Sequence, residues 1–114
     1  MKKLNKIYGR LGETLAESYL KKRKYKILEK NYSNYLGEID LIALKDEVIV
    51  FIEVKLRNSL EYGAPCEAVT PFKQRKIRSV AMYYLQKNNL TDKDCRFDVI
   101  EVFDDKVKHI ENCF

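Results

Sequence analysis

The sequence predicts a mixed-sheet α/β domain with the element order helix, three strands, helix, two strands. In the middle of the chain, two neighbouring apolar segments separated by a short polar break indicate a strand hairpin. A helix is expected on either side of it, so that the third strand and the strand after the second helix form a parallel crossover pair. With 114 residues, 46% of them hydrophobic, the whole chain is long enough to form one domain.

The first expected element is an amphipathic helix over about residues 8–23. Its apolar residues share one broad face, which consists of Tyr8, Leu11, Leu15, Ala16, Tyr19 and Leu20. Glu13 falls at the edge of that face and is able to point inward, although a helix glutamate is by default a charge exposed to solvent. The basic run KKRKYK at residues 21–26 ends the helix, either to stabilise its negative end or to contact phosphate.

A strand over residues 25–31 and a loop over residues 32–36 are expected to follow the first helix. The loop carries two aromatic side chains, Tyr32 and Tyr35, among polar residues. Such tyrosines either pack against the protein or stack on unpaired bases, and packing is the more common use.

The central hairpin is expected to pair residues 38–44 with residues 48–56. Both segments are apolar almost without alternation, which is typical of a sheet that is covered on both faces. A charged side chain in either segment is therefore unusual. The three charges found there are Asp40, Glu53 and Lys55.

The register of this hairpin decides where those charges lie. If Asp46 and Glu47 are the two turn residues, counting outward along antiparallel strands places Asp40 directly across from Glu53. Lys55 lies on the same face, because side chains alternate along a strand. The two carboxylates repel each other and lose hydration, so a divalent cation between them would stabilise the pair. A salt bridge of Lys55 with the carboxylates is the alternative.

A second helix is expected over residues 71–88, after a loop over residues 58–67 that shows no clear pattern. Thr70 as N-cap and the proline that follows it mark the start of this helix. Near that start, Lys73 and Gln74 fall on the inward face. They either hold a phosphate together with the free helix N–H groups or make local structural contacts.

Two short strands, over residues 96–103 and 106–112, are expected to end the chain. Asp98 and Arg96 share one face of the first of them, so we expect a structural ion pair. His109 is the only histidine. Because no second histidine or cysteine lies at ligand spacing, we expect it at the surface.

Composition narrows the classes of partner. The formal net charge of +5 is unevenly spread, since residues 1–30 hold ten Lys or Arg against three acids, whereas residues 89–114 hold four against seven. This asymmetry favours a polyanionic partner at the N-terminal half, and a solvated lysine-rich surface is the alternative. No apolar segment reaches the roughly 18 residues of a membrane span, and the start lacks the apolar segment of a signal peptide. We therefore expect a cytoplasmic protein without a membrane partner.

The three cysteines, Cys66, Cys95 and Cys113, are separated by 29 and 18 residues and form no C-x-x-C pair. This odd number and this spacing indicate neither a zinc site nor a disulfide framework. We expect three reduced thiols.

Four motifs follow one another along the chain: Gly12-Glu13 with Ala16 and Leu20, GEIDLI at residues 37–42, FIEVK at residues 51–55 with Arg57, and RFDV at residues 96–99. Over about residues 9–103 this ordered set resembles the YraN-like family of small bacterial proteins. Within the set, Asp40 followed by Glu53-Val54-Lys55 resembles the D…ExK signature of the PD-(D/E)XK nuclease superfamily. Ile39 stands where that superfamily usually has a proline.

The resemblance implies a restriction-endonuclease-like fold, similar to that of Holliday-junction resolvases. It also implies metal-dependent cleavage of nucleic acid, with structured or branched DNA as the expected substrate. Asp40 and Glu53 would bind Mg²⁺ or Mn²⁺, and the carbonyl of Val54 would add a ligand. Lys55 would orient the attacking water or neutralise charge that develops on the phosphate. The further candidates for catalysis are Glu13 and Gln74.

The candidate residues for binding nucleic acid are Arg10, Lys21, Lys22, Arg23, Arg57 and Lys73. Resolvase-like relatives act as two-fold dimers, so the resemblance also implies a homodimer. Two other functions are compatible with the sequence. One is a nucleic-acid-binding module that has the fold without catalysis, and the other is a structural interaction protein, which leaves the charged strand residues unexplained.

Overall fold

The computed structural model describes residues 2–57 and 64–114, with the side chains of residues 2–9 left out. Its elements, in chain order, are α1 (Lys2–Lys22), β1 (Lys26–Asn34), β2 (Gly37–Lys45), β3 (Val48–Arg57), the short 3-10 helix η1 (Pro65–Ala68), α2 (Pro71–Lys87), β4 (Asp94–Phe103) and β5 (Lys106–Ile110). The order of helices and strands is the predicted one. No helix among these described residues is long and apolar enough to cross a membrane.

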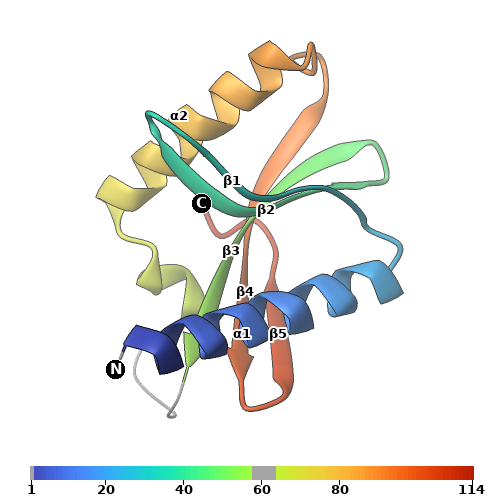
Figure 1. Ribbon diagram of the computed structural model, residues 1–114. Helices are drawn as coiled ribbons and strands as arrows, with labels where there is room; N and C mark the ends of the chain where they lie inside the picture. The colour runs from blue at the N-terminus through green and yellow to red at the C-terminus, as the bar shows by residue number, and fades with distance from the viewer. Residues whose placement is uncertain (1, 58–63) are drawn as a thin grey trace.

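The five strands form one sheet in the order β1-β2-β3-β4-β5 (Figure 1). Neighbouring strands are antiparallel except β3 and β4, which are parallel and are connected through α2, so the predicted crossover pair is confirmed. In the central hairpin, Lys45 pairs with Val48 and Leu41 pairs with Ile52. This is the predicted register.

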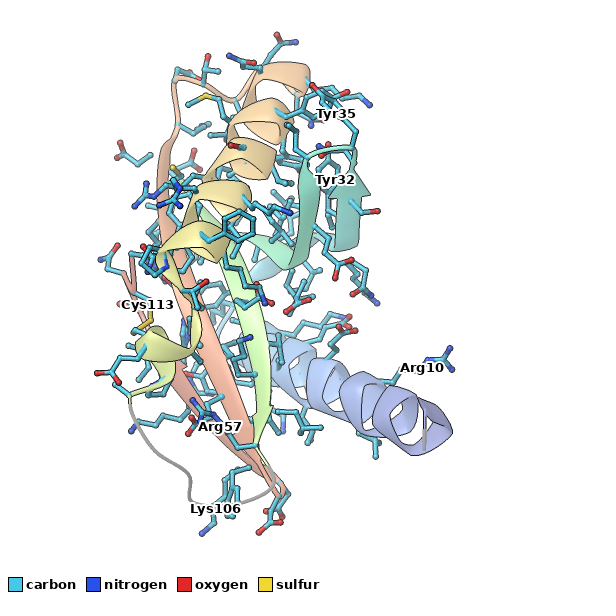
Figure 2. All side chains as sticks on the ribbon, turned by 90° about the vertical axis from the view of Figure 1, so that its left-hand side faces the viewer. Arg10, Tyr32, Tyr35, Arg57, Lys106 and Cys113 are labelled. Carbon is cyan, nitrogen blue, oxygen red and sulfur yellow. A yellow bond between two sulfur atoms is a disulfide. The ribbon has the colours of Figure 1, made fainter. Side chains whose placement is uncertain are left out.

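A separate apolar core lies on each face of the sheet, because the strand residues alternate between the two faces. Ala16 and Leu20 of α1 are fully buried on one face, and Ile77 and Val80 of α2 are buried on the other. The predicted apolar face of α1 is wrong at Leu11, which is exposed. The N-terminal end of α1 projects beyond the sheet (Figure 2).

Several element boundaries differ from the sequence prediction. β1 continues through most of the predicted loop, because it stays paired with β2 as far as Asn34 and Gly37. Tyr32 therefore packs inside, with its ring centroid 5.1 Å from that of Tyr84. The helix α1 begins at Lys2, well before residue 8. Of the predicted loop over 58–67, the first six residues lie outside the described part, as does the side chain of Tyr8.

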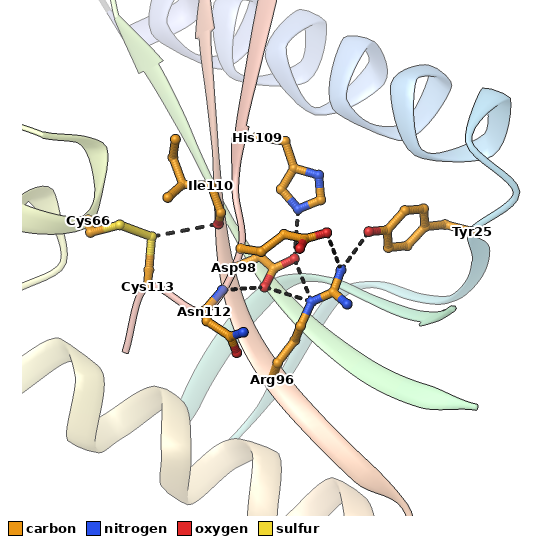
Figure 3. A network of polar contacts seen from close by, with 9 residues as sticks. Tyr25, Cys66, Arg96, Asp98, His109, Ile110, Asn112 and Cys113 are labelled. Atoms are coloured by element: carbon orange, nitrogen blue, oxygen red, sulfur yellow. Dashed lines mark hydrogen bonds and ion pairs between the residues drawn. A yellow bond between two sulfur atoms is a disulfide. The ribbon is translucent and has the colours of Figure 1, made fainter. Parts of the chain in front are cut away.

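Asp98 is the centre of a buried polar network between β4, β5 and α1 (Figure 3). Its two carboxylate oxygens both accept from Arg96 Nε at 3.1 Å, and the backbone N–H of Asn112 donates to Oδ1 at 3.1 Å. Arg96 Nη2 also donates to the hydroxyl of Tyr25 at 2.6 Å. The predicted structural pair of Arg96 and Asp98 is confirmed.

The predicted surface position of His109 is wrong. Its side chain is 5% exposed, its Nε2 lies 2.6 Å from Asp98 Oδ2, and the rings of Tyr19 and Tyr25 lie against it. β5 directs this residue toward α1, so the missing second histidine or cysteine has no bearing on its burial. The ring completes the hydrogen bonding of a buried carboxylate.

Replacing Asp98 by asparagine should lower the free energy of unfolding by about 3 kcal/mol, because it removes a buried charge that Arg96 needs as its partner. The measurement is urea unfolding at neutral pH. Asp105→Asn, at an exposed position, is the matched control and should unfold at the wild-type midpoint. A wild-type midpoint for Asp98→Asn would contradict the assigned role.

The expectation of three reduced thiols is also wrong. Cys66, in η1, and Cys113, after β5, form a disulfide with their Cα atoms 5.2 Å apart, whereas Cys95 is free and exposed (Figure 3). The two bonded residues are 47 positions apart. Their proximity arises only when η1 packs beside β4, so the spacing in the sequence could not indicate it.

Candidate functional site

The candidate site lies where β2 and β3 stop pairing. Leu41 and Ile52 are the last paired residues at this end. One step further, the backbone N–H of Val54 donates to Asp40 Oδ2 at 2.7 Å, so a side-chain carboxylate takes the place of the next strand carbonyl. The strands diverge before Asp40 and Glu53 can form the predicted cross-strand pair, but the Asp40 side chain still lies within hydrogen-bond reach of Glu53.

The surroundings of Asp40 strongly change its pKa. Burial raises the pKa of Asp40 to about 8, with further contributions from the hydrogen bond and the charge of Glu53, and against the opposing effects of the Val54 N–H and Lys73. Glu53 itself is only 9% exposed. Close to neutral pH Asp40 therefore keeps its proton in the metal-free protein, and a bound cation would take over the same role of relieving the repulsion.

Two lysines lie on the same side of the sheet as the carboxylates. Lys73 Nζ is 3.7 Å from Glu53 Oε1, and its side chain is 42% exposed. Burial lowers the pKa of Lys55, as do the hydrogen bond and charge of Lys73, whereas Glu53 and Asp40 act in the opposite direction. Among the described residues, the ion pair of the site is made by Lys73, from α2, and not by Lys55 as the alternative interpretation expected.

The two further candidates for catalysis differ in position. Burial raises the pKa of Glu13, and the charges of Asp40 and Glu38 raise it further, while a hydrogen bond with Asn31 lowers it. Glu13 of α1 therefore adds negative charge on the Asp40 side of the site. Gln74 Nε2, by contrast, donates to the carbonyl of Val69 at 3.0 Å, which is a local structural contact.

The donor atoms suit a hard divalent cation. In the described part of the chain there is no group of three or more His, Cys, Asp or Glu side chains placed to hold a metal. Asp40 and Glu53 nevertheless offer two carboxylates, and the carbonyl of Val54 faces the same strand edge as its N–H, which is bound to Asp40. All these donors are oxygens. Mg²⁺ is commonly bound by one or two carboxylates and keeps several waters, so this set fits it.

Most predicted nucleic-acid-binding residues are already engaged in local contacts. Arg57 Nε pairs with Glu101 at 3.1 Å, and both side chains are largely buried. Lys21 pairs with Glu17 at 2.8 Å. The guanidinium of Arg23 lies 3.8 Å from the centre of the Tyr19 ring. The two that are simply exposed are Arg10 and Lys22.

The basic end of α1 also lies away from the carboxylates. Lys45 Nζ donates to the carbonyl of Arg23 at 2.7 Å, which fixes this end beside the β2–β3 turn. Along β2, Lys45 is five residues from Asp40, or about 16 Å. Here Lys22 and Arg23 help to line a pocket of about 450 Å³. Of the predicted phosphate-binding residues, only Lys73 contacts the carboxylate pair.

A basic surface that the sequence prediction missed lies on α2. The helix has five basic residues and no acidic one: Lys73, Arg75, Lys76, Arg78 and Lys87. This excess equals the net charge of the whole chain. Counting charges within each expected helix, and not only over residues 1–30 and 89–114, would have found this surface.

Together these features define a small α/β protein in which a mixed five-stranded sheet lies between two helices. Its candidate site is a pair of interacting Asp and Glu side chains, next to a lysine, where two central strands diverge. The chain belongs to the family described as Uncharacterised protein family UPF0102, which it matches over residues 12–102. This confirms the resemblance to the YraN-like family.

Relatives match the chain over nearly its full length. A UPF0102 protein of Clostridioides difficile (strain 630) is 48% identical, over 96% of this chain and 98% of its own. A UPF0102 protein of Caldanaerobacter subterraneus subsp. tengcongensis is 48% identical over the whole of both chains. One from Clostridium perfringens (strain 13 / Type A) is 54% identical, over 90% of this chain and 84% of its own.

Proposed function

We propose that this protein is a metal-dependent endonuclease that hydrolyses the phosphodiester backbone of nucleic acid, in particular DNA with branched or otherwise irregular structure. One observation carries the proposal. The carboxylates of Asp40 and Glu53 are forced together at the end of the β2–β3 ladder, with Lys55 and Lys73 beside them. Placing two carboxylates together in an apolar sheet destabilises the metal-free protein, because they repel each other and lose hydration. A bound cation would offset both effects.

The residues have distinct roles in this proposal. Asp40 and Glu53, with the carbonyl of Val54, would hold Mg²⁺ or Mn²⁺. The bound ion would activate water and stabilise negative charge on the phosphate. Burial and Lys73 lower the pKa of Lys55, so more of its side chain is neutral than in an ordinary lysine, and the neutral amine would orient the attacking water and take up its proton. Lys73, exposed at the rim, would neutralise the phosphate that enters.

A second candidate function is a nucleic-acid-binding module without catalysis. It is favoured by the absence, within the described residues, of a third His, Cys, Asp or Glu side chain placed to hold a metal ion together with the pair. Such a module needs the basic surface of α2 but no coupled carboxylates, so the endonuclease explains more of the site. The proposal includes action in the cytoplasm, where bacterial DNA lies, and the homodimer implied by resolvase-like relatives.

The experiment that tests the proposal is incubation with end-labelled DNA and RNA in linear, nicked, flapped and four-way-junction form. Parallel reactions contain Mg²⁺, Mn²⁺ or EDTA. We expect cleavage of at least one branched substrate with a metal and none with EDTA. Binding without cleavage under all conditions would support the binding module, and neither binding nor cleavage would contradict both functions.

A further inference from the structure

The helix α2 carries a row of alternating aromatic and basic side chains along one edge. Phe72, Lys76, Tyr83 and Lys87 fall within about 60° of its circumference at 100° per residue. We call these four residues the α2 row. Lys76 Nζ lies 4.9 Å from the centre of the Phe72 ring, and Lys87 Nζ lies 5.8 Å from that of Tyr83. The row is about 22 Å long.

Tyr35 adds a second aromatic ring at the distal end of the row. It lies in the turn between β1 and β2, is 85% exposed, and meets Tyr83 edge-on with the centroids 6.1 Å apart (Figure 2). Tyr32, by contrast, packs against the buried Tyr84, so burial explains Tyr32 but not the exposed Tyr35. An aromatic ring held against a neighbour yet open to solvent is suited to stack on a partner.

The charge around the row selects an anionic partner. The row includes two of the five basic residues of α2, and the helix has no acidic residue to neutralise them. Phosphates satisfy the ammonium groups, and the flat faces of bases satisfy the tyrosine rings. An acidic peptide would satisfy only the ammonium groups, so a nucleic acid with accessible bases fits the row better.

The row also leads away from the candidate site. Phe72, at its proximal end, is the neighbour of Lys73, which contacts Glu53. From Lys73 to Tyr83 the helix spans ten residues, or about 15 Å. A strand whose backbone is held at the carboxylates would therefore continue along Lys76 to the two tyrosines.

We propose that the α2 row and Tyr35 form a track for a single-stranded segment of nucleic acid, with an unpaired base stacked on Tyr35 and phosphates held by Lys76 and Lys87. This inference rests on the proposed function and deepens it by naming the substrate class, a strand that is unpaired beside the point of cleavage. A uniform duplex keeps its bases stacked internally and offers Tyr35 only phosphates.

Fluorescence anisotropy with a labelled single strand and with the duplex of the same sequence, both in EDTA, tests the track. Wild type should bind the single strand more tightly. Tyr35→Ala should weaken binding of the single strand about 5- to 100-fold and leave the duplex nearly unchanged, whereas Tyr35→Phe should retain most of the affinity. Met82→Ala removes an exposed side chain of the same helix that lies roughly 110° from the middle of the row, and this variant should behave as wild type.

The lysines have a separate readout. Replacing Lys76 and Lys87 together by glutamine should reduce the slope of log K against log salt for the single strand by about 1.4, because each phosphate contact contributes about 0.7. An unchanged slope would show that these lysines only cover the helix.

The failure of the track is distinguishable from the failure of the proposed function. If the duplex binds as tightly as the single strand and Tyr35→Ala binds both as wild type does, the track is overturned, and the panel of substrates still decides the endonuclease. If polyglutamate competes as well as the single strand at equal charge concentration, the partner is an acidic protein and the track is also overturned. If no form of nucleic acid binds, both proposals are wrong.

Discussion

Replacing Glu53 by glutamine should reduce metal-dependent cleavage by at least about 100-fold, because it removes one of two carboxylate ligands. Glutamine keeps the shape of the side chain and its position on β3. The measurement is the rate of cleavage of the best substrate of the panel, with Mg²⁺ and with Mn²⁺. Glu67→Gln, at an exposed position in η1, is the matched control and should cleave at the wild-type rate.

The same substitution should leave the metal-free protein as stable as wild type or more stable. It removes the charge of Glu53, which helps to force Asp40 to keep a proton near neutral pH. The lost contact with Lys73 is long and partly exposed, so it contributes little. Mn²⁺ should raise the melting temperature of wild type and raise that of Glu53→Gln less, since a ligand that binds the folded state stabilises it.

A purely structural ion cluster predicts the opposite pattern of melting temperatures. In that case Glu53→Gln would melt well below wild type in EDTA, because it leaves a lysine without its partner. Millimolar Mn²⁺ would then shift neither protein. That pair of results would remove the chemical basis of the endonuclease and leave the binding module.

The raised pKa of Asp40 should make the metal-free protein less stable as the pH rises. In the unfolded chain this carboxyl ionises near its ordinary pKa of 3.8, whereas in the folded protein it keeps its proton up to a pKa of about 8. Between these values the folded state binds more protons than the unfolded state. The contribution of Asp40 to the free energy of unfolding is therefore largest below about pH 4 and falls, by up to about 1.4 kcal/mol per pH unit, until about pH 8.

Asp40→Asn isolates this effect, since its amide oxygen still accepts from the N–H of Val54. Urea unfolding in EDTA is measured at pH 5 and at pH 8 for both proteins. Between pH 5 and pH 8, the free energy of unfolding of Asp40→Asn should rise by up to about 4 kcal/mol relative to that of wild type. Parallel changes with pH in the two proteins would mean that Asp40 is ionised throughout and that the carboxylates are not coupled.

The sequence by itself determined the local elements and the centre of the site. Thr70 followed by proline fixed the start of α2, where the Thr70 hydroxyl accepts from the N–H of Lys73. The turn at residues 46–47 fixed the hairpin register, and with it the meeting of Asp40 and Glu53. These features depend on residues close together in the chain or on counting along one hairpin, so the periodicity of side chains is sufficient to place them.

Only the tertiary structure decided the contacts between distant segments. The burial of His109 against Asp98, the disulfide of Cys66 with Cys113 and the exposure of Tyr35 beside Tyr83 each depend on how two separate elements pack. The contact of Lys73 with Glu53 arises in the same way, because α2 begins above the middle of β3. Sequence periodicity shows which face of an element is apolar. Which element packs against that face depends on how the whole sheet is buried between α1 and α2.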